Sequence, residues 1–448
     1  MSDHAKHQYG EFLQQLPGDW QQAEIRQLGA VVGGGTPSRE VSSYWQGSIP
    51  WVTPGEVSGV DRQLLHDTQE HVSPAGLSGS GANLLPVGSL MVTTRATLGA
   101  RVINAVPMAT NQGFKSIVFK YPEEGGYYFH LFEKIKPELI RRASGTTFLE
   151  ISGNEFGSIQ VPNPPAPEKK VITQILDTLD IAIRETEALI DKLKAVKQGL
   201  LHDLLTRGID ANGQLRPPQS EAPQLYKESP LGWIPQEWEA VELNQLIDPK
   251  RPVVYGILMP GYGHPGGVPV VKVKDIFDGK IHLNDLLLTS PKIDREYSRS
   301  RLKAGDLLFT IRGTVSRTAF VPPALDSANI TQDTARLAVT GTDARFLRAY
   351  LGMAVPSRFI ATHTLGVAVQ GINLRDVRRI PIARPSALEA KAIADEIQSL
   401  EQRLESESLS AAKLRLAKAG LMDDLLTGRV RVNPLLESVQ QPVGQTRA

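Results

Sequence analysis

The chain of 448 residues contains no cysteine. This absence excludes disulfide bonds, cysteine zinc sites and thiol catalysis, and it is typical of a reducing compartment. Long apolar runs are also missing, because no stretch approaches the roughly 20 residues that a membrane-spanning helix needs. The polar start MSDHAKHQYGEF lacks the apolar stretch of a signal peptide. We therefore expect a cytoplasmic protein that does not enter a membrane.

Neither sign of charge predominates over the whole chain, which has 49 Lys and Arg against 48 Asp and Glu. The distribution is nevertheless uneven. Residues 1–166 contain 12 basic and 15 acidic groups, a net charge of −3, whereas residues 231–388 contain 20 and 14, a net charge of +6. The second segment can attract a polyanion by itself, and the first is not obviously basic.

Catalytic motifs are absent or incomplete. NPPA at 163–166 ends in Ala166, which cannot stack on a flipped base as the aromatic residue of an amino-methyltransferase motif does, so it predicts a helix start. GGG at 33–35 is not followed by the Gly-Lys-Ser/Thr of a phosphate loop, and the nine histidines show no spacing that favours a metal site. Glu133 and Lys136 favour an exposed ion pair on a helix over part of a nuclease site. We expect no catalytic residue and no metal.

The second half of the chain repeats the first. Residues 193–206 read LKAVKQGLLHDLLT, and residues 414–427 read LRLAKAGLMDDLLT, at an offset of 221. Upstream, LPVGSLMVTTRAT (85–97) resembles LKAGDLLFTIRGT (302–314) at an offset of 217. Internal repeats indicate a duplicated structural unit. The changing offset indicates small insertions in the globular parts, ahead of a helix of fixed length.

Each repeat ends in a stretch with heptad spacing. Ten positions spaced alternately by three and four residues are apolar in eight of ten cases in both copies, and the polar breaks, Thr186 and Lys197 against Glu407 and Lys418, fall at the same steps. This pattern predicts a coiled coil. The predicted seam consists of Ile172, Leu176, Leu179, Ile183, Ile190, Leu193, Leu200 and Leu204 in the first helix, and of Ile393, Ile397, Leu400, Leu404, Leu414, Leu421 and Leu425 in the second.

These patterns predict an α+β fold with two similar mixed α/β heads. Each head is followed by a long helix, and the short linker requires the second helix to return antiparallel to the first, with pseudo-twofold symmetry. Ser386 and Glu389 match a capping box at the start of the second helix, and Gly208 and Gly428 are the expected C-terminal stops of the two helices. The expected segments are a first head at 1–166, a helix at 167–207, a linker at 208–230, a second head at 231–388, a helix at 389–428 and a flexible tail at 429–448.

Within the heads, several short elements can be predicted. β-branched and aromatic runs favour strands, and apolar residues at helical spacing favour helices. A Gly-rich segment follows each predicted helix, at 144–153 and 362–371. Such segments leave backbone donors free for phosphates or a partner. The predicted strands are 89–96, 115–121, 268–276, 306–313 and 335–341, and the predicted helices are 127–144 and 343–355.

The combination resembles the specificity subunit of Type I restriction–modification enzymes. The resemblance rests on the run from Gly305 to Thr314, its copy from Gly88 to Thr97, the VPNPPAPEKKVI entry to the first helix and the two DLLT exits. It implies that each head is a target recognition domain for one half of a bipartite double-stranded DNA sequence, and that the coiled coil sets the gap. The chain would be non-catalytic. Two methyltransferase subunits, which bind S-adenosylmethionine and methylate adenine at N6, and restriction subunits would dock on it.

Candidate DNA contacts follow from this resemblance and from residue chemistry. Arginine pairs with guanine or clamps phosphate, and residues present in both heads favour positioning over specificity. Specificity is expected where the heads differ, at 51–56 against 271–276 and at 146–147 against 368–369. The candidates are Trp51, Thr53, Arg95, Thr97 and Thr146 in the first head, and Lys272, Lys274, Arg312, Thr314, Arg317 and Asn373 in the second.

Two other interpretations remain open at this point. The chain could be the recognition subunit of a fused nuclease–methyltransferase system. Alternatively, its coiled coil could join two protein partners without DNA, which the net negative charge of the first head favours.

Overall fold

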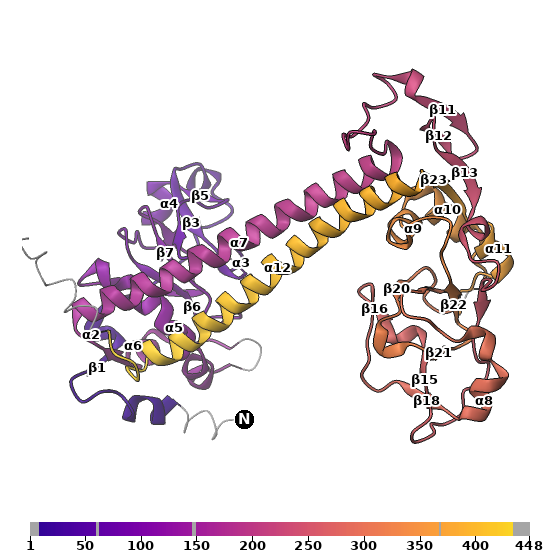
Figure 1. The fold of residues 1–448 in the computed structure, drawn as a ribbon. Helices are drawn as coiled ribbons and strands as arrows, with labels where there is room; N and C mark the ends of the chain where they lie inside the picture. The colour runs from indigo at the N-terminus through magenta and orange to yellow at the C-terminus, as the bar shows by residue number, and fades with distance from the viewer. Residues whose placement is uncertain (1–8, 60–61, 146–148, 367–368, 433–448) are drawn as a thin grey trace, which may run out of the picture. The chain divides into compact units, whose positions relative to one another are not determined.

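The computed structural model describes residues 9–59, 62–145, 149–366 and 369–432. They form two compact units (Figure 1). The first unit comprises Met1–Glu187 with Leu409–Ala448, and the second comprises Ala188–Ser408. Each unit therefore contains one predicted head and a part of both long helices. No helix of the described residues is long and apolar enough to cross a membrane.

The first head is built on a five-stranded sheet of order β2-β9-β6-β7-β4 and a three-stranded sheet of order β5-β3-β8. Helix α5 contributes Tyr127, Leu131 and Phe132 to the largest buried cluster of this head. The elements are β1 (Gln21–Glu24), α2 (Ile25–Leu28), β2 (Gly29–Gly33), η1 (Ser42–Trp45), β3 (Ile49–Val52), α3 (Pro54–Val57), β4 (Leu64–Leu65), β5 (His71–Val72), α4 (Pro74–Ser78), β6 (Leu90–Thr93), β7 (Arg101–Asn104), β8 (Ala109–Thr110), β9 (Phe114–Phe119), η2 (Pro122–Glu124), α5 (Gly125–Arg142), α6 (Gly153–Gly157) and β10 (Gln160–Asn163).

The second head contains a four-stranded sheet of order β14-β22-β19-β20 and a three-stranded sheet of order β18-β15-β21. The elements are η3 (Pro223–Leu225), β11 (Tyr226–Ser229), β12 (Gly232–Pro235), β13 (Glu239–Glu242), η4 (Leu243–Leu246), β14 (Val254–Tyr255), β15 (Val268–Val271), η5 (Val273–Asp275), β16 (Ile276–Phe277), β17 (Lys280–Ile281), β18 (Leu287–Thr289), α8 (Pro291–Glu296), η6 (Ser298–Ser300), β19 (Leu307–Thr310), β20 (Thr318–Phe320), η7 (Pro323–Leu325), β21 (Asn329–Ile330), β22 (Thr334–Leu337), α9 (Ala344–Leu351), α10 (Ala354–His363), α11 (Leu374–Arg378) and β23 (Pro381–Arg384).

The two heads share one topology. The order β14-β22-β19-β20 repeats β2-β9-β6-β7, and β18-β15-β21 repeats β5-β3-β8. The central strand of each small sheet pairs antiparallel with one neighbour and parallel with the other. The pair β13-β23 likewise repeats β1-β10. The prediction of two similar mixed α/β heads is therefore confirmed.

The long helices α7 (Ala166–Thr206) and α12 (Ala387–Leu425) are antiparallel. In the first unit Lys418 of α12 pairs with Asp180 of α7, and in the second unit Lys197 pairs with Glu401 at 2.6 Å. Adding 221 to 180 gives 401, and adding 221 to 197 gives 418. The two ion pairs are therefore copies in which the helices exchange roles. Both lysines occupy polar breaks of the predicted seam, so these breaks form interhelical ion pairs.

The predicted seam residues are all buried or half-buried. Each Ile or Leu that is fully removed from water stabilises the packing by about 1.5–3 kcal/mol. The buried ones are Ile172, Leu176, Ile183, Ile190, Leu193, Leu204, Ile393, Ile397 and Leu425. The half-buried ones are Leu179, Leu200, Leu400, Leu404, Leu414 and Leu421.

An arginine ties the end of each long helix to the start of the other. In the second unit Arg216, which follows α7, donates to Glu389 in the first turn of α12 and to Glu237 at 2.8 Å. The side chains of Arg216 and Glu389 are each only 9% exposed. Removal of either partner would leave an uncompensated charge in a water-poor site.

The first unit repeats this arginine clamp. Arg431, which follows α12, donates to Glu168 in the first turn of α7 at 2.5 Å and to Asp19 at 2.7 Å. The hydrogen bond from Arg431 lowers the pKa of the Asp19 carboxyl. Gly208 and Gly428 precede the two arginines and have φ of +63° and +70°, so both helices end in a left-handed glycine, as predicted.

The segments that follow the two long helices are packed where the clamps hold them. The linker at 208–230 is held against the second unit by Arg216, and it includes β11, which pairs with β12. The tail at 429–448 begins packed, because Val432 is 2% exposed and belongs to the core of the first unit. Residues 433–448 lie outside the described part of the chain.

Three local predictions were also wrong in part. Residues 343–355 form two helices, because Gly352 closes α9 and α10 starts at Ala354. The strand predicted at 268–276 ends at Val271, and a 3-10 turn follows at Val273–Asp275. At the predicted capping box the Ser386 hydroxyl accepts from the Glu389 backbone N–H at 3.2 Å, but the Glu389 carboxylate turns to Arg216 and to the backbone N–H of Ile209.

Candidate nucleic-acid interface

The repeated sequence after β6 and β19 forms the same turn in both heads. The Thr93 hydroxyl accepts from the Ala100 backbone N–H at 3.0 Å, and Thr310 accepts from Arg317 at 2.9 Å. Each turn has two left-handed positions. Ala96 and Gly99 hold them in the first head at φ of 62° and 85°, and Gly313 and Ser316 hold them in the second at 81° and 71°. Each of these turns therefore places one residue other than glycine in a conformation that costs about 1–2 kcal/mol.

The Gly-rich segment of each head lies against this turn. The backbone of Arg95 forms an isolated antiparallel β-bridge with that of Glu150 in the first head, and the backbone of Arg312 forms the same bridge with that of Gly371 in the second. The structure thus brings together two segments that the sequence singled out separately. Thr146, with residue 147, lies outside the described residues, and so does residue 368.

The two arginines meet different partners across this bridge. The Arg95 side chain forms an ion pair with Glu150 at 3.7 Å. Arg312 is exposed and forms no ion pair among the described residues, because glycine stands where the first head has glutamate. The arginine at this position is therefore compensated in the first head and free in the second.

A hollow of about 540 Å³ opens beside Arg312 in the second head. Its lining combines Arg312 and Gln332 with apolar side chains, of which Leu365 and Val369 are 72% and 57% exposed. Tyr255 and Leu258 also line it. Arginine and glutamine read guanine and adenine edges, and apolar groups contact the thymine methyl group, so this lining suits a base-pair edge in a groove.

The first head differs at the same sheet positions. Gly33 pairs with Lys115 on β9 as Tyr255 pairs with Ala335 on β22, so glycine stands where the second head has tyrosine. Three residues further on, the Thr36 hydroxyl bonds the amide of Gln112. Apolar exposed side chains of the second head are thus replaced by small and polar residues in the first.

Trp51 lies in the interior of the first head. It is 2% exposed, lies in a small apolar cluster and donates its indole N–H to the Gly35 carbonyl at 2.9 Å. Trp51 was selected because it lies where the two heads differ, and its burial argues against a contact with DNA.

Several other candidates stabilise local backbone structure. Thr53 and Glu56 form a cap at the start of α3, with the Thr53 backbone N–H donating to the carboxylate at 2.9 Å. Lys272 donates its backbone N–H to Asp275 in the same way, at 2.8 Å. Asn373 caps α11 by accepting from the Asp376 backbone N–H at 2.9 Å.

The remaining candidates lie on or beside the turn. Thr97, Thr314 and Lys274 are exposed, and Arg317 is half-buried and donates to the Ile276 carbonyl at 3.0 Å. These side chains stay candidates for DNA contacts. Of the whole set, Arg312 combines exposure with a free charge and a neighbouring hollow.

A cluster of His130, Asp177 and Asp180 could hold a metal ion by its spacing, and the sequence analysis missed it. The three residues lie on α5 and α7, too far apart in the chain to form a motif. The His130 ring bonds Asp177 at 2.7 Å, and Asp180 is paired with Lys418. The Lys418 ammonium already neutralises the Asp180 carboxylate, which a metal ion would need as a ligand. The cluster therefore serves as a link between helices.

Comparison with known proteins agrees with this architecture. Residues 17–195 match the model of the Type I restriction modification DNA specificity domain. The MjaIX specificity subunit of a Type I restriction enzyme from Methanocaldococcus jannaschii is 26% identical over 273 residues, which cover 59% of this chain and 60% of that protein. The EcoBI specificity subunit from Escherichia coli is 25% identical over 276 residues, covering 61% and 58%. The match thus spans about three fifths of these relatives.

The fold is that of a solved specificity subunit. The crystal structure of the S subunit of a Type I restriction–modification system from M. genitalium superposes with a TM-score of 0.54 and 13% identity, over 91% of this chain and 96% of that one. The resemblance drawn from the duplicated sequence is confirmed, because residues 17–195 match the specificity-domain model and the fold is similar to that of a solved S subunit.

Proposed function

We propose that this chain is the DNA-specificity subunit of a Type I restriction–modification enzyme. Each head reads one half of a bipartite double-stranded target, and the paired helices α7 and α12 set the gap between the halves. The observation that carries this proposal is the recurrence of one turn and one Gly-rich loop in both heads, with side chains that differ around the shared arginine. A common scaffold with different surface chemistry suits two different half-sites.

The chain supplies recognition, and catalysis belongs to its partners. Two methyltransferase subunits that bind S-adenosylmethionine and methylate adenine at N6 dock on it, and restriction subunits complete the enzyme. The repeated ion pairs between α7 and α12 support two equivalent docking positions, because an internal repeat presents the same surface twice. Such a complex works where the chromosome lies, in the cytoplasm.

Co-expression with the methyltransferase encoded beside its gene tests the proposal. Methylated adenines are then mapped across the genome. We expect one two-part motif with a fixed gap. Absence of any methylation would favour a protein adaptor, and a motif without a gap would contradict two separate reading heads.

The role of the helices in setting the gap has its own test. Four residues, about one helical turn, are inserted into both α7 and α12 near the middle of each helix. The gap of the methylated motif should lengthen while both half-sites keep their letters. Changed letters with an unchanged gap would contradict this role.

A further inference from the structure

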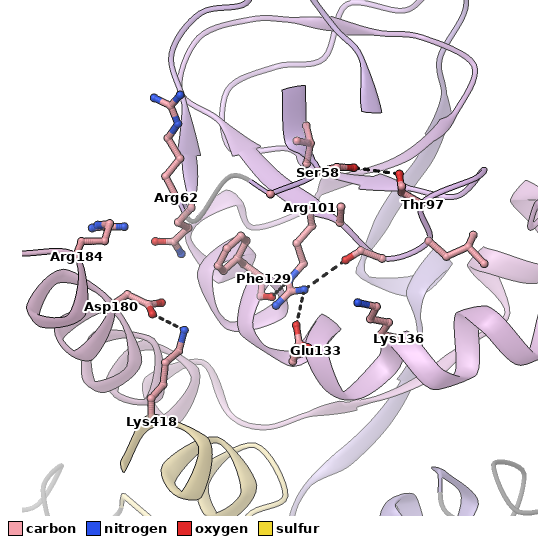
Figure 2. Close-up of a pocket in the computed structure, with 16 residues that line it drawn as sticks. Ser58, Arg62, Thr97, Arg101, Phe129, Glu133, Lys136, Asp180, Arg184 and Lys418 are labelled. Carbon is pink, nitrogen blue, oxygen red and sulfur yellow. Dashed lines mark hydrogen bonds and ion pairs between the residues drawn. The ribbon is translucent and has the colours of Figure 1, made fainter. Parts of the chain in front are cut away.

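A second hollow, of about 510 Å³, lies in the first unit beside the turn (Figure 2). Its walls come from β7 and α5 of the head and from α7 and α12 of the helix pair. Figure 2 shows Arg184 and Lys136 on opposite sides of this hollow and Arg62 at its rim. A hollow with cations from several elements is a candidate anion site.

The two carboxylates in this hollow are already neutralised. Glu133 accepts from Arg101 at 3.1 Å, and Asp180 is paired with Lys418. Burial lowers the pKa of the Arg101 guanidinium, and the charge of Glu133 opposes this shift. Arg101 also lies 5.0 Å from the centre of the Phe129 ring, so it is held in place as part of the wall.

Three cations remain without a carboxylate. Lys136, Arg184 and Arg62 are exposed and form no ion pair among the described residues. The expected pair between Glu133 and Lys136 is absent, because Glu133 turns to Arg101 instead. The hollow therefore carries a local net charge of about +3 in a head whose overall charge is negative.

Neutral polar groups connect this hollow to the candidate interface. The Ser58 hydroxyl donates to the Thr97 hydroxyl at 3.1 Å, and both residues line the hollow. Thr97 belongs to the turn that contains Arg95. Gly99, at the other end of this turn, leaves room for Lys136, because a Cβ atom there would stand 3.0 Å from the lysine Cγ.

The corresponding place in the second unit has fewer free cations. A hollow between β20, α9 and α12 is lined by Arg345 and Glu401. Arg345 is paired with Asp343 at 2.7 Å and with Asp395 at 2.8 Å, and Glu401 is paired with Lys197. Arg348 also lines this hollow and forms no ion pair among the described residues, so the second unit has one free cation here where the first unit has three.

We propose that this hollow holds a short stretch of DNA backbone and contacts its phosphates through Lys136 and Arg184. The proposal rests on the proposed function, since it takes DNA as the ligand. Cations on two sides of the hollow suit successive phosphates of one strand. Phosphate contacts carry no sequence information but fix the position of a protein on the duplex. The first head, which is acidic overall and has its Arg95 compensated, would gain its grip on DNA here.

The test compares Lys136→Ala, Arg184→Ala and the double variant with the wild-type full chain, alone and with the neighbouring methyltransferase. Exposed cations outside the hollow, replaced in Lys120→Ala and Arg358→Ala, serve as matched controls. Fluorescence anisotropy gives the Kd for target and non-target duplexes over a range of KCl concentrations. Each lost phosphate contact should reduce the slope of log Kd against log[KCl] by about one and weaken target and non-target binding alike. The methylated motif should keep its letters.

Two results would overturn the proposal. An unchanged slope in the double variant, with wild-type binding intact, would exclude DNA phosphates from the hollow. Calorimetric titration with pyrophosphate tests whether the hollow binds a free phosphate compound instead of DNA. If the double variant loses pyrophosphate binding while its DNA slope stays unchanged, the hollow is a site for a free phosphate compound. Failure of wild-type chain and complex to bind any DNA would instead refute the proposed function.

Discussion

The two heads share a backbone but present different surfaces around the same turn. The first has Gly33 at the end of β2 and a paired Arg95, and the second has Tyr255 at the end of β14 and a free Arg312. The free cations of the first unit lie instead in the hollow beside α7. The comparison teaches that the two heads share their sheets and helix ends, whereas the free cations lie in different places in the two units.

The largest expected effect concerns the two arginine clamps. Arg216→Ala should destabilise the second unit by about 3–5 kcal/mol, because it leaves the buried Glu389 without a partner. Arg431→Ala should cost less, because Arg431 is the more exposed of the two arginines. Urea unfolding gives the loss of stability, and hydrogen exchange read by mass spectrometry shows in which unit protection is lost.

Glu237→Gln is the matched control for the second clamp. The Glu237 side chain is 76% exposed, so its loss should change stability by less than about 1 kcal/mol. Equal losses in Arg216→Ala and Glu237→Gln would mean that the buried pair with Glu389 is unimportant.

The next effect separates the two turns by their arginines. Arg312→Ala should weaken target binding by about 1–3 kcal/mol, because its guanidinium is free to contact a base or phosphate. Arg95→Ala should cost less, because Glu150 already compensates Arg95. Fluorescence anisotropy on the methylated motif measures both, and a larger loss for Arg95→Ala would reverse the comparison.

Exchange of the opposing residues sharpens the same point. Glu150→Gly should free Arg95 and strengthen DNA binding, and Gly371→Glu should weaken it by pairing Arg312. Gly371 has room for a side chain, since a Cβ atom would stand 3.5 Å from the Ile311 carbonyl. If both variants changed DNA affinity in the same direction, the residue opposite the arginine would not determine how well the arginine binds DNA.

A smaller effect concerns the left-handed positions of the turns. Gly313→Ala should destabilise the second unit by about 1–2 kcal/mol through backbone strain alone, because no atom lies within 4 Å of the added Cβ atom. Ala96→Gly should stabilise the first unit by removing the corresponding strain at φ of 62°. Thermal unfolding measures both changes in stability, which should have opposite signs. A stabilising effect of Gly313→Ala would contradict a left-handed backbone at this position of both turns.

The smallest effect is a pH dependence of the first clamp. The pKa of Asp19 is lowered from 3.8 by the hydrogen bond from Arg431, so its carboxylate stabilises the folded state above that value. This contribution is lost as the pH falls through the lowered pKa. Asp19→Asn should therefore flatten the loss of stability below about pH 4, measured by urea unfolding. An unchanged acid profile would exclude Asp19 from this linkage.

The repeat allowed the scaffold to be predicted, but not the site. Heptad spacing identified the helices because buried positions recur at fixed intervals, and Gly208 and Gly428 marked their ends. The Arg101–Glu133 pair and the His130 cluster join elements far apart in the chain, so no local pattern announced them. The net charge of residues 1–166 did not indicate the free Lys136 and Arg184, because the two carboxylates that line the same hollow are paired with other cations. Trp51 shows that a residue type without its burial does not identify a contact.

Methylation mapping of a surface variant tests the central claim that each head reads its own half-site through its differing surface. The variant Tyr255→Gly/Leu258→Thr gives the hollow of the second head the residue types that the first head has at Gly33 and Thr36. We predict a motif whose first half and gap are unchanged and whose second half is altered or relaxed. An unchanged second half, or a change in both halves together, would contradict the account.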